Sequence, residues 1–174
     1  PPVFAIRCTK RLLDRSRLPF AVASAPTTTV LGDWYANILI TRPQHLVLCI
    51  SEKTLLPVVV TAKDLKALPS RLTKALEDML GRIGVPQSLV HAEVREMSES
   101  YFAKTESRKV LGSLNDFMFH LQDGCASDTF LSLEERAMKL ANMPSGAIEF
   151  AFPSEQTLSL FQAKQAIEAA QSAA

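Results

Sequence analysis

The chain has 174 residues, of which 47% are hydrophobic and 21% charged, and its formal net charge is +1. This length predicts one compact domain, or one domain with an appendage. Nine Phe residues are too many for a disordered tail, and no apolar run approaches the roughly 20 residues that cross a bilayer. We therefore expect a soluble globular protein with no membrane partner, and the small net charge alone gives no reason to expect a polyanion partner.

The two halves of the chain carry opposite charges. Residues 1–87 hold 12 Lys and Arg against 6 Asp and Glu, a net charge of +6, whereas residues 88–174 hold 7 against 12, a net charge of −5. The most basic stretch contains Arg7, Lys10, Arg11 and Arg15. One interpretation is that the halves neutralise each other in the fold; the other is that the basic stretch binds nucleic acid or a protein partner.

The first elements are a strand, a helix and a loop. Val3 to Arg7 is apolar enough for a strand, and Thr9 can cap a helix that turns Leu12 and Leu13 inward. Residues 19–32, which are rich in Pro and Thr, are typical of a loop.

Three β-rich runs follow and predict a small, mainly antiparallel sheet around residues 37–60. The runs are residues 37–41, 45–52 and 55–60, and a turn at Pro43 joins the first two into a hairpin. Pro57 removes one amide donor from the third run, which predicts an edge position or a bulge there.

Helical patterns dominate the remaining chain, with two interruptions. We predict a capping box at residues 61–64, helices over 69–83, 110–121 and 132–143, strands over 89–97 and 148–152, and a closing Ala/Gln-rich helix. The class is therefore α+β: a single domain over residues 1–155, with residues 156–174 as a packed appendage or extension.

Polar residues concentrate at 105–116, where two interpretations remain open. Ser113 can cap the following helix with Asp116 as its capping-box partner. Alternatively, Arg108 and Ser113 belong to an anion site at the helix N-terminus. A similar choice exists for Trp34, the only tryptophan, which either packs in the core or stacks on a nucleic-acid base beside the basic helix.

Catalytic signals are weak. Asp33, Asn115 and Asp116 could serve a metal-dependent hydrolase only if the fold brings them together. The sequence has no glycine-rich phosphate loop and no metal-ligand spacing, so we expect neither a cofactor nor a bound metal. Three scattered cysteines without CxxC spacing predict free thiols and a reducing, cytoplasmic location.

Several strings resemble an uncharacterised bacterial family of unknown function. They are residues 6–10, 31–37, 44–52, 55–58, 62–65 and 110–117. The resemblance covers most of residues 6–120 and the remainder more loosely, and the segment after Phe161 has no place in the pattern. Some members are associated with plasmid or transposon-passenger proteins, which implies a mobile-element context. No catalytic residue carries over from the family.

Three hypotheses follow from these patterns. The first is a non-enzymatic binding or regulatory module for nucleic acid or a protein partner. The second is a small metal-dependent hydrolase or nuclease. The third is a homodimer that pairs through the sheet edge near Pro57.

Overall fold

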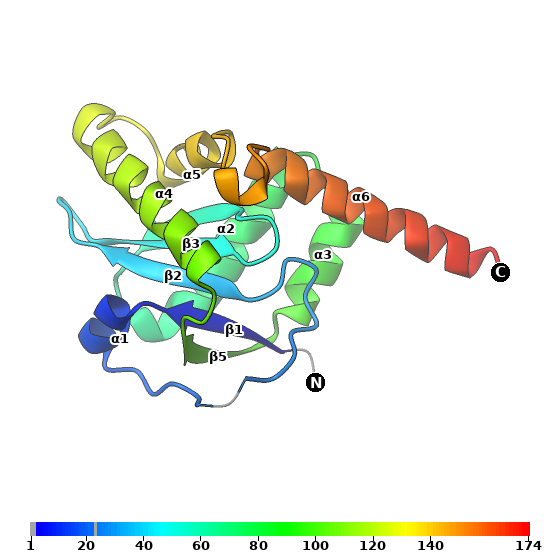
Figure 1. Cartoon of the computed structure of the whole chain (residues 1–174), viewed down its shortest axis with the longest axis horizontal. Coiled ribbons are helices and arrows are strands. Elements are labelled where there is room, and N and C mark those ends of the chain that lie inside the picture. The colour runs from blue at the N-terminus through cyan, green and yellow to red at the C-terminus, as the bar shows by residue number, and fades with distance from the viewer. Residues whose placement is uncertain (1–2, 23) are drawn as a thin grey trace.

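A five-stranded mixed sheet forms the centre of the computed structural model, which describes residues 3–22 and 24–174 (Figure 1). Its strands are β1 (Val3–Cys8), β2 (Trp34–Leu39), β3 (Leu46–Ser51), β4 (Pro57–Thr61) and β5 (Glu99–Lys104), and they lie in the order β4-β3-β2-β1-β5. The antiparallel meander β2-β3-β4 confirms the prediction for residues 37–60. Strand β1 pairs in parallel with both β2 and β5, so the complete sheet is mixed.

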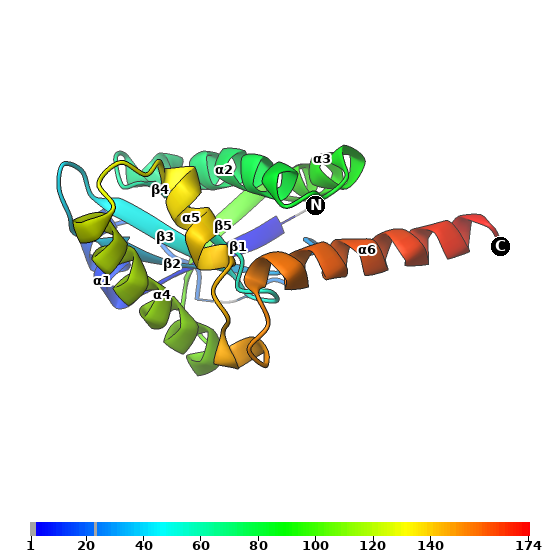
Figure 2. The same cartoon turned by 90° about the horizontal axis from the view of Figure 1, so that it is seen from above.

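Helices cover both faces of this sheet. They are α1 (Lys10–Ser16), α2 (Leu68–Arg82), α3 (Gln87–Glu96), α4 (Arg108–Ser127), α5 (Leu133–Ala141) and α6 (Pro153–Ser172), with 3₁₀ turns η1 (Leu65–Ala67) and η2 (Gly146–Ile148). Figure 2 shows α2 and α3 on one side of the sheet and α4 on the other. The α+β class and the single domain are therefore confirmed, and none of the helices in the described residues has the length and apolar character of a membrane span.

Strand β4 lies at the edge of the sheet, as Pro57 predicted. This edge is not bare, because β4 contacts α2 and α5. Val58, Val59 and Val60 are all at most 5% exposed. The edge near Pro57 is therefore covered within the domain and does not favour pairing with a second copy.

The strand predicted over residues 89–97 is wrong, because these residues form α3. Alternating Val90, Ala92 and Val94 imitate a strand, but the buried face of the helix also contains Glu93, which is fully buried. Its carboxylate accepts hydrogen bonds from the amides of Val30 at 2.8 Å and Leu31 at 3.0 Å. A buried charge with specific backbone partners is invisible to a hydrophobic pattern.

Two predicted helix starts are also wrong. Helix α4 begins after Ser107, whose hydroxyl accepts a hydrogen bond from the Val110 amide. Ser113 therefore lies inside the helix, where its hydroxyl donates to the Lys109 carbonyl at 3.3 Å. At residues 61–64 no capping box forms: Asp64 adopts a left-handed conformation with no side-chain cap. By contrast, the capping box of Ser132 and Glu135 is confirmed by both of its hydrogen bonds.

The segment predicted as a strand over residues 148–152 instead forms the end of η2 and a turn. Glu149 and Phe150 both have positive φ, which interrupts an extended strand. Only one isolated bridge, between Ser145 and Ala151, is recorded here. The alternation of Ile148, Phe150 and Phe152 is thus a local coincidence, and Phe150 is 76% exposed.

Helix α6 confirms the predicted closing helix and leaves the body of the molecule along its length (Figures 1 and 2). Its first turns are anchored: Phe161 is fully buried, and the Thr157 hydroxyl lies 2.7 Å from that of Thr54. Beyond Phe161 every residue except Lys164 is exposed.

Candidate functional site

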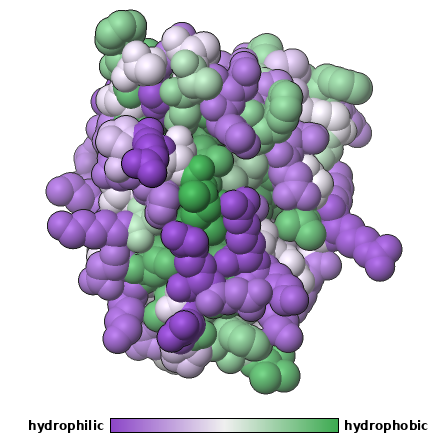
Figure 3. All heavy atoms as spheres, turned by 90° about the vertical axis from the view of Figure 1, so that its left-hand side faces the viewer, coloured by the Kyte–Doolittle hydropathy of each residue, from purple (hydrophilic) through white to green (hydrophobic). Residues whose placement is uncertain are grey.

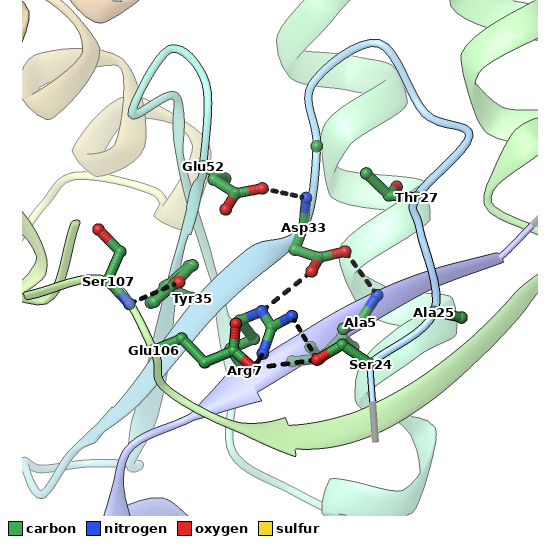
Figure 4. A network of polar contacts seen from close by, with 12 residues as sticks. Ala5, Arg7, Ser24, Ala25, Thr27, Asp33, Tyr35, Glu52, Glu106 and Ser107 are labelled. Atoms are coloured by element: carbon green, nitrogen blue, oxygen red, sulfur yellow. Dashed lines mark hydrogen bonds and ion pairs between the residues drawn. The ribbon is translucent and has the colours of Figure 1, made fainter. Parts of the chain in front are cut away.

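The basic stretch at the N-terminus is divided by the fold into a buried and an exposed part. Arg7 lies on β1, an inner strand between β2 and β5, and is only 4% exposed. Its Nε donates to Asp33 Oδ2 at 2.9 Å, and its Nη1 lies 2.9 Å from Glu106 Oε1 (Figure 4). The remaining donors reach the Lys104 carbonyl at 3.2 Å and the Ser24 hydroxyl at 3.0 Å.

We call Arg7 and these hydrogen-bond partners the Arg7 cluster, and residues 18–22 and 24–32 the strap. The Arg7 cluster holds the strap against the sheet. The Ser24 hydroxyl accepts from Arg7 and donates to Glu106 Oε1 at 2.9 Å. Asp33, which directly follows the strap, accepts a hydrogen bond from the Ala5 amide at 3.0 Å. Arg7 therefore joins β1, the strap and the connection from β5 to α4, and each of its three guanidinium nitrogens has at least one partner.

The electrostatics of the cluster agree with a structural role. Burial acts to lower the pKa of Arg7, but the Asp33 and Glu106 carboxylates outweigh it and raise that pKa above its ordinary value. For Tyr35, by contrast, burial raises the pKa, because it disfavours the charged phenolate; the phenol oxygen accepts a hydrogen bond from the Ser107 amide at 3.1 Å. Charged and polar groups that pair with one another in this way hold a fold together.

The other cations of the stretch point to solvent. Lys10, Arg11, Arg15 and Arg17 are exposed on or next to α1. Among the described residues no carboxylate lies within ion-pair distance of any of them. The two halves of the chain are joined by the Arg7–Glu106 pair and by His91, whose Nε2 lies 3.9 Å from Glu77 Oε1. Direct pairing with the acidic half therefore does not neutralise these charges.

A cavity of about 470 Å³ opens beside the end of α1. Arg15 contributes to one wall, and Lys63 and Lys66, which follow β4, contribute to another. Leu18 and Ile38 add apolar surface. Figure 3 looks onto this end of the molecule and shows hydrophilic side chains around a hollow with hydrophobic atoms in it.

We name six exposed cations the basic surface: Lys10, Arg11, Arg15, Arg17, Lys63 and Lys66. Asp14 and Asp64 are exposed among them and reduce their charge without pairing with them. Sequence patterns do not identify Lys63 and Lys66 as candidate binding residues, because these lysines lie far from α1 in the sequence. The excess positive charge of residues 1–87 includes them but gives no indication that the fold places them opposite Arg15.

His45 adds a polar group to the wall of this cavity. Its Nδ1 lies 3.0 Å from the Thr41 carbonyl oxygen and 3.3 Å from the Thr41 amide nitrogen. This pairing fixes the imidazole ring at the end of the β2–β3 hairpin. Its Nε2 has no hydrogen-bond partner among the described residues, so it can serve a ligand in either tautomer.

A second cavity, of about 270 Å³, lies between α4 and α5. Lys139 pairs with the Asp128 carboxylate, and Arg136 donates through Nη2 to the Asp128 carbonyl, while its buried Nη1 has no partner among the described residues. The cavity beside α1, with its three cations that no carboxylate pairs among the described residues, is therefore the stronger candidate for an anionic ligand.

The remaining sequence candidates lie apart from this surface. Trp34 is fully buried and its Nε1 has no partner among the described residues, so it cannot stack on a base at the surface. Asp33 is buried with its carboxylate on Arg7, whereas Asn115 and Asp116 are exposed on α4. Arg108 is exposed at the start of α4, and Ser113, buried inside that helix, does not help it form an anion site.

The structure thus defines an α+β domain with a polar cluster around the buried Arg7 and an exposed basic surface on and near α1. The family of the domain of unknown function DUF6933 matches residues 5–156, and the chain belongs to this family. A comparison with curated proteins finds no match. The family membership confirms the resemblance at the level of a domain of unknown function.

Proposed function

We propose that this protein is a non-enzymatic module that binds nucleic acid through the basic surface. The observation that carries the proposal is that six exposed cations lie on α1, next to it or across the adjacent cavity, while in the described part of the chain no carboxylate pairs with them. Lys and Arg side chains that are free to replace counterions supply most of the non-specific affinity for a phosphate backbone.

The local field supports this proposal better than the net charge does. A net charge of +1 averages the basic and acidic halves. At physiological salt, charges further apart than about 8 Å are largely screened. A phosphate chain lying along α1 therefore responds to the nearby cations and only weakly to the distant acidic half. A mobile-element context and a reducing, cytoplasmic location, which suits three free cysteines, fit the same role.

The alternative, a metal-dependent hydrolase using Asp33, Asn115 and Asp116, has less support. The Asp33 carboxylate is committed to Arg7 and to the Ala5 amide. Among residues 3–22 and 24–174 no cluster of three or more His, Cys, Asp or Glu side chains has an arrangement suited to a metal ion. The three candidates therefore lack the shared geometry that metal-assisted hydrolysis requires.

The proposal is tested by fluorescence anisotropy with labelled single-stranded and duplex DNA at low salt. The variant Lys10→Gln/Arg11→Gln/Arg15→Gln removes three cations of the basic surface. The control Lys53→Gln/Lys74→Gln/Arg95→Gln removes three exposed cations elsewhere, so both variants undergo the same change in net charge.

We expect the first variant to lose roughly tenfold or more in affinity and the control to change little, because only the first loses phosphate contacts. Equal losses of DNA affinity in the two variants would show that binding depends on net charge alone and would refute the assignment to the basic surface. Wild-type protein that binds an acidic peptide but no DNA would transfer the surface to a protein partner and refute the nucleic-acid proposal.

A further inference from the structure

The cavity beside α1 has the size and lining of a site for a small organic group attached to an anion. Its volume of about 470 Å³ lies within the range of roughly 300–1,000 Å³ that is typical of small-molecule sites. Leu18, Ile38 and Leu65 line it with apolar surface. A purely ionic surface for phosphates alone would not require this apolar hollow.

Polar groups line the same cavity together with these apolar side chains. The side chains of Gln44 and Thr61 belong to the lining, and His45 adds a ring whose Nε2 has no partner among the described residues. Amide, hydroxyl and imidazole groups can donate to and accept from the edge of a nucleobase. The apolar side chains can contact its flat face.

The cations lie where the phosphate of such a ligand would lie. Arg15, Lys63 and Lys66 are exposed and contribute to the lining, so they are at the mouth of the cavity. Asp64 is the single carboxylate in the lining. A ligand with a flat, weakly polar ring and a negatively charged group at one end therefore matches the site in both polarity and charge.

We propose that the cavity accepts one unstacked nucleotide of a single-stranded nucleic acid, with the base inside and the flanking phosphates on the basic surface. This inference rests on the proposed function and adds a preference to it. In a duplex the bases are stacked and paired, so none can enter the cavity without an energetic cost. Single strands present bases that are already free to turn outward. The protein thus prefers single strands, overhangs or ends.

The first test uses the wild-type protein and two single-stranded oligonucleotides of equal length and charge. One carries thymine at every position, and the other carries abasic sites throughout. Because the phosphates are the same, a difference in affinity reports contacts with bases. We expect roughly tenfold tighter binding of the strand that carries bases, as for one well-stacked base. Equal affinity would overturn the inference.

The second test fills the cavity. Ala62 lines it and is half-buried, so Ala62→Phe places a ring in the space reserved for the base. Ala169→Phe, on the exposed part of α6, is the matched control. We expect Ala62→Phe to lose about tenfold in affinity for the thymine strand and to keep the wild-type affinity for duplex DNA.

The outcomes separate this inference from the proposed function. Undiminished binding of single strands by Ala62→Phe, with weakened binding by the triple variant of α1, refutes the nucleotide site and leaves the basic surface intact. Absence of binding to any nucleic acid by the wild-type protein refutes both. The comparison of base-bearing and abasic strands needs no variant, so it decides the question even where Ala62→Phe does not fold.

Discussion

Arg7 and Arg15 belong to one basic stretch of the sequence, yet the structure gives them opposite surroundings. Arg7 is on an inner strand of the sheet and is 4% exposed, with two carboxylates within 3 Å of its guanidinium. Arg15 is exposed at the end of α1, where it lines an open cavity. Whether a cation stabilises the fold or remains free to bind therefore depends on whether its strand or helix buries that position. The number of charged residues nearby in the sequence does not decide it.

Arg7 and Arg15 differ because strand β1 is covered by neighbouring segments and one side of helix α1 is open to solvent. Strand β1 has neighbours on both edges, and the strap crosses one of its faces, so a charge on that face must be paired. Helix α1 turns Leu12 into the core and leaves its cations in water. The following predictions test this contrast, beginning with the largest expected effect.

Removal of the buried cation gives the largest expected effect. Arg7→Ala leaves the Asp33 carboxylate buried without its charged partner, so we expect a loss of about 3–5 kcal/mol in the free energy of unfolding. Arg11→Ala, on the exposed side of the comparison, should stay within about 0.5 kcal/mol of wild type. Urea unfolding followed by circular dichroism measures both. Similar losses for the two variants would refute the division into a buried and an exposed part.

The second prediction concerns Glu93, the buried carboxylate of the acidic half. Burial raises its pKa above the ordinary value of 4.5, and the amides of Val30 and Leu31 offset only part of that increase. The folded state therefore holds the proton more tightly than the unfolded state. This contribution to stability is complete below pH 4.5 and is lost as the pH rises through the folded pKa.

The measurement compares wild-type protein with Glu93→Gln, whose amide does not titrate. The unfolding free energy of wild type relative to this variant should be greatest below pH 4.5 and decline at higher pH. Urea titrations at several pH values follow this difference. A difference that grows as the pH rises would mean that the Glu93 pKa is lowered in the folded protein.

Thr9 lies between strand β1, which carries Arg7, and helix α1, and we expect its substitution to have a smaller effect on the free energy of unfolding. Its hydroxyl caps α1 by accepting from the Leu12 amide at 3.4 Å and lies 2.7 Å from Asn37 Oδ1 on β2. Thr9→Ala should cost about 1 kcal/mol in the free energy of unfolding, typical of a lost N-cap. Thr9→Ser keeps the hydroxyl and should recover most of that loss. A full loss in the serine variant would assign the effect to the methyl group.

The prediction of the fold succeeds where local patterns decide structure. Apolar spacing is enough for α2, and a proline turn between two β-rich runs is enough for the β2–β3 hairpin. The prediction fails at residues 89–97, where the alternation of Val90, Ala92 and Val94 competes with a helical face completed by a buried Glu93. It also misses β5, because Glu99 and Ser100 are exposed polar residues that pair only through their backbone.

The candidate site is also predictable only where local sequence patterns determine it. The exposed cations of α1 follow from an amphipathic helix near the N-terminus. The burial of Arg7 does not, because its partners Ser24, Asp33 and Glu106 come from three separate segments. Long-range pairing of this kind has no local signature. The same holds for Lys63 and Lys66, which only the tertiary fold places beside α1.

The most direct test of the central claim is the salt dependence of DNA binding. For single strands, the slope of log K against log salt changes by about 0.7 for each phosphate contact. The variant Lys10→Gln/Arg11→Gln/Arg15→Gln should therefore have a slope shallower than wild type by about two. The control Lys53→Gln/Lys74→Gln/Arg95→Gln should keep the wild-type slope. Identical slopes for wild type and the variant of α1 would contradict the claim that these exposed cations contact phosphates.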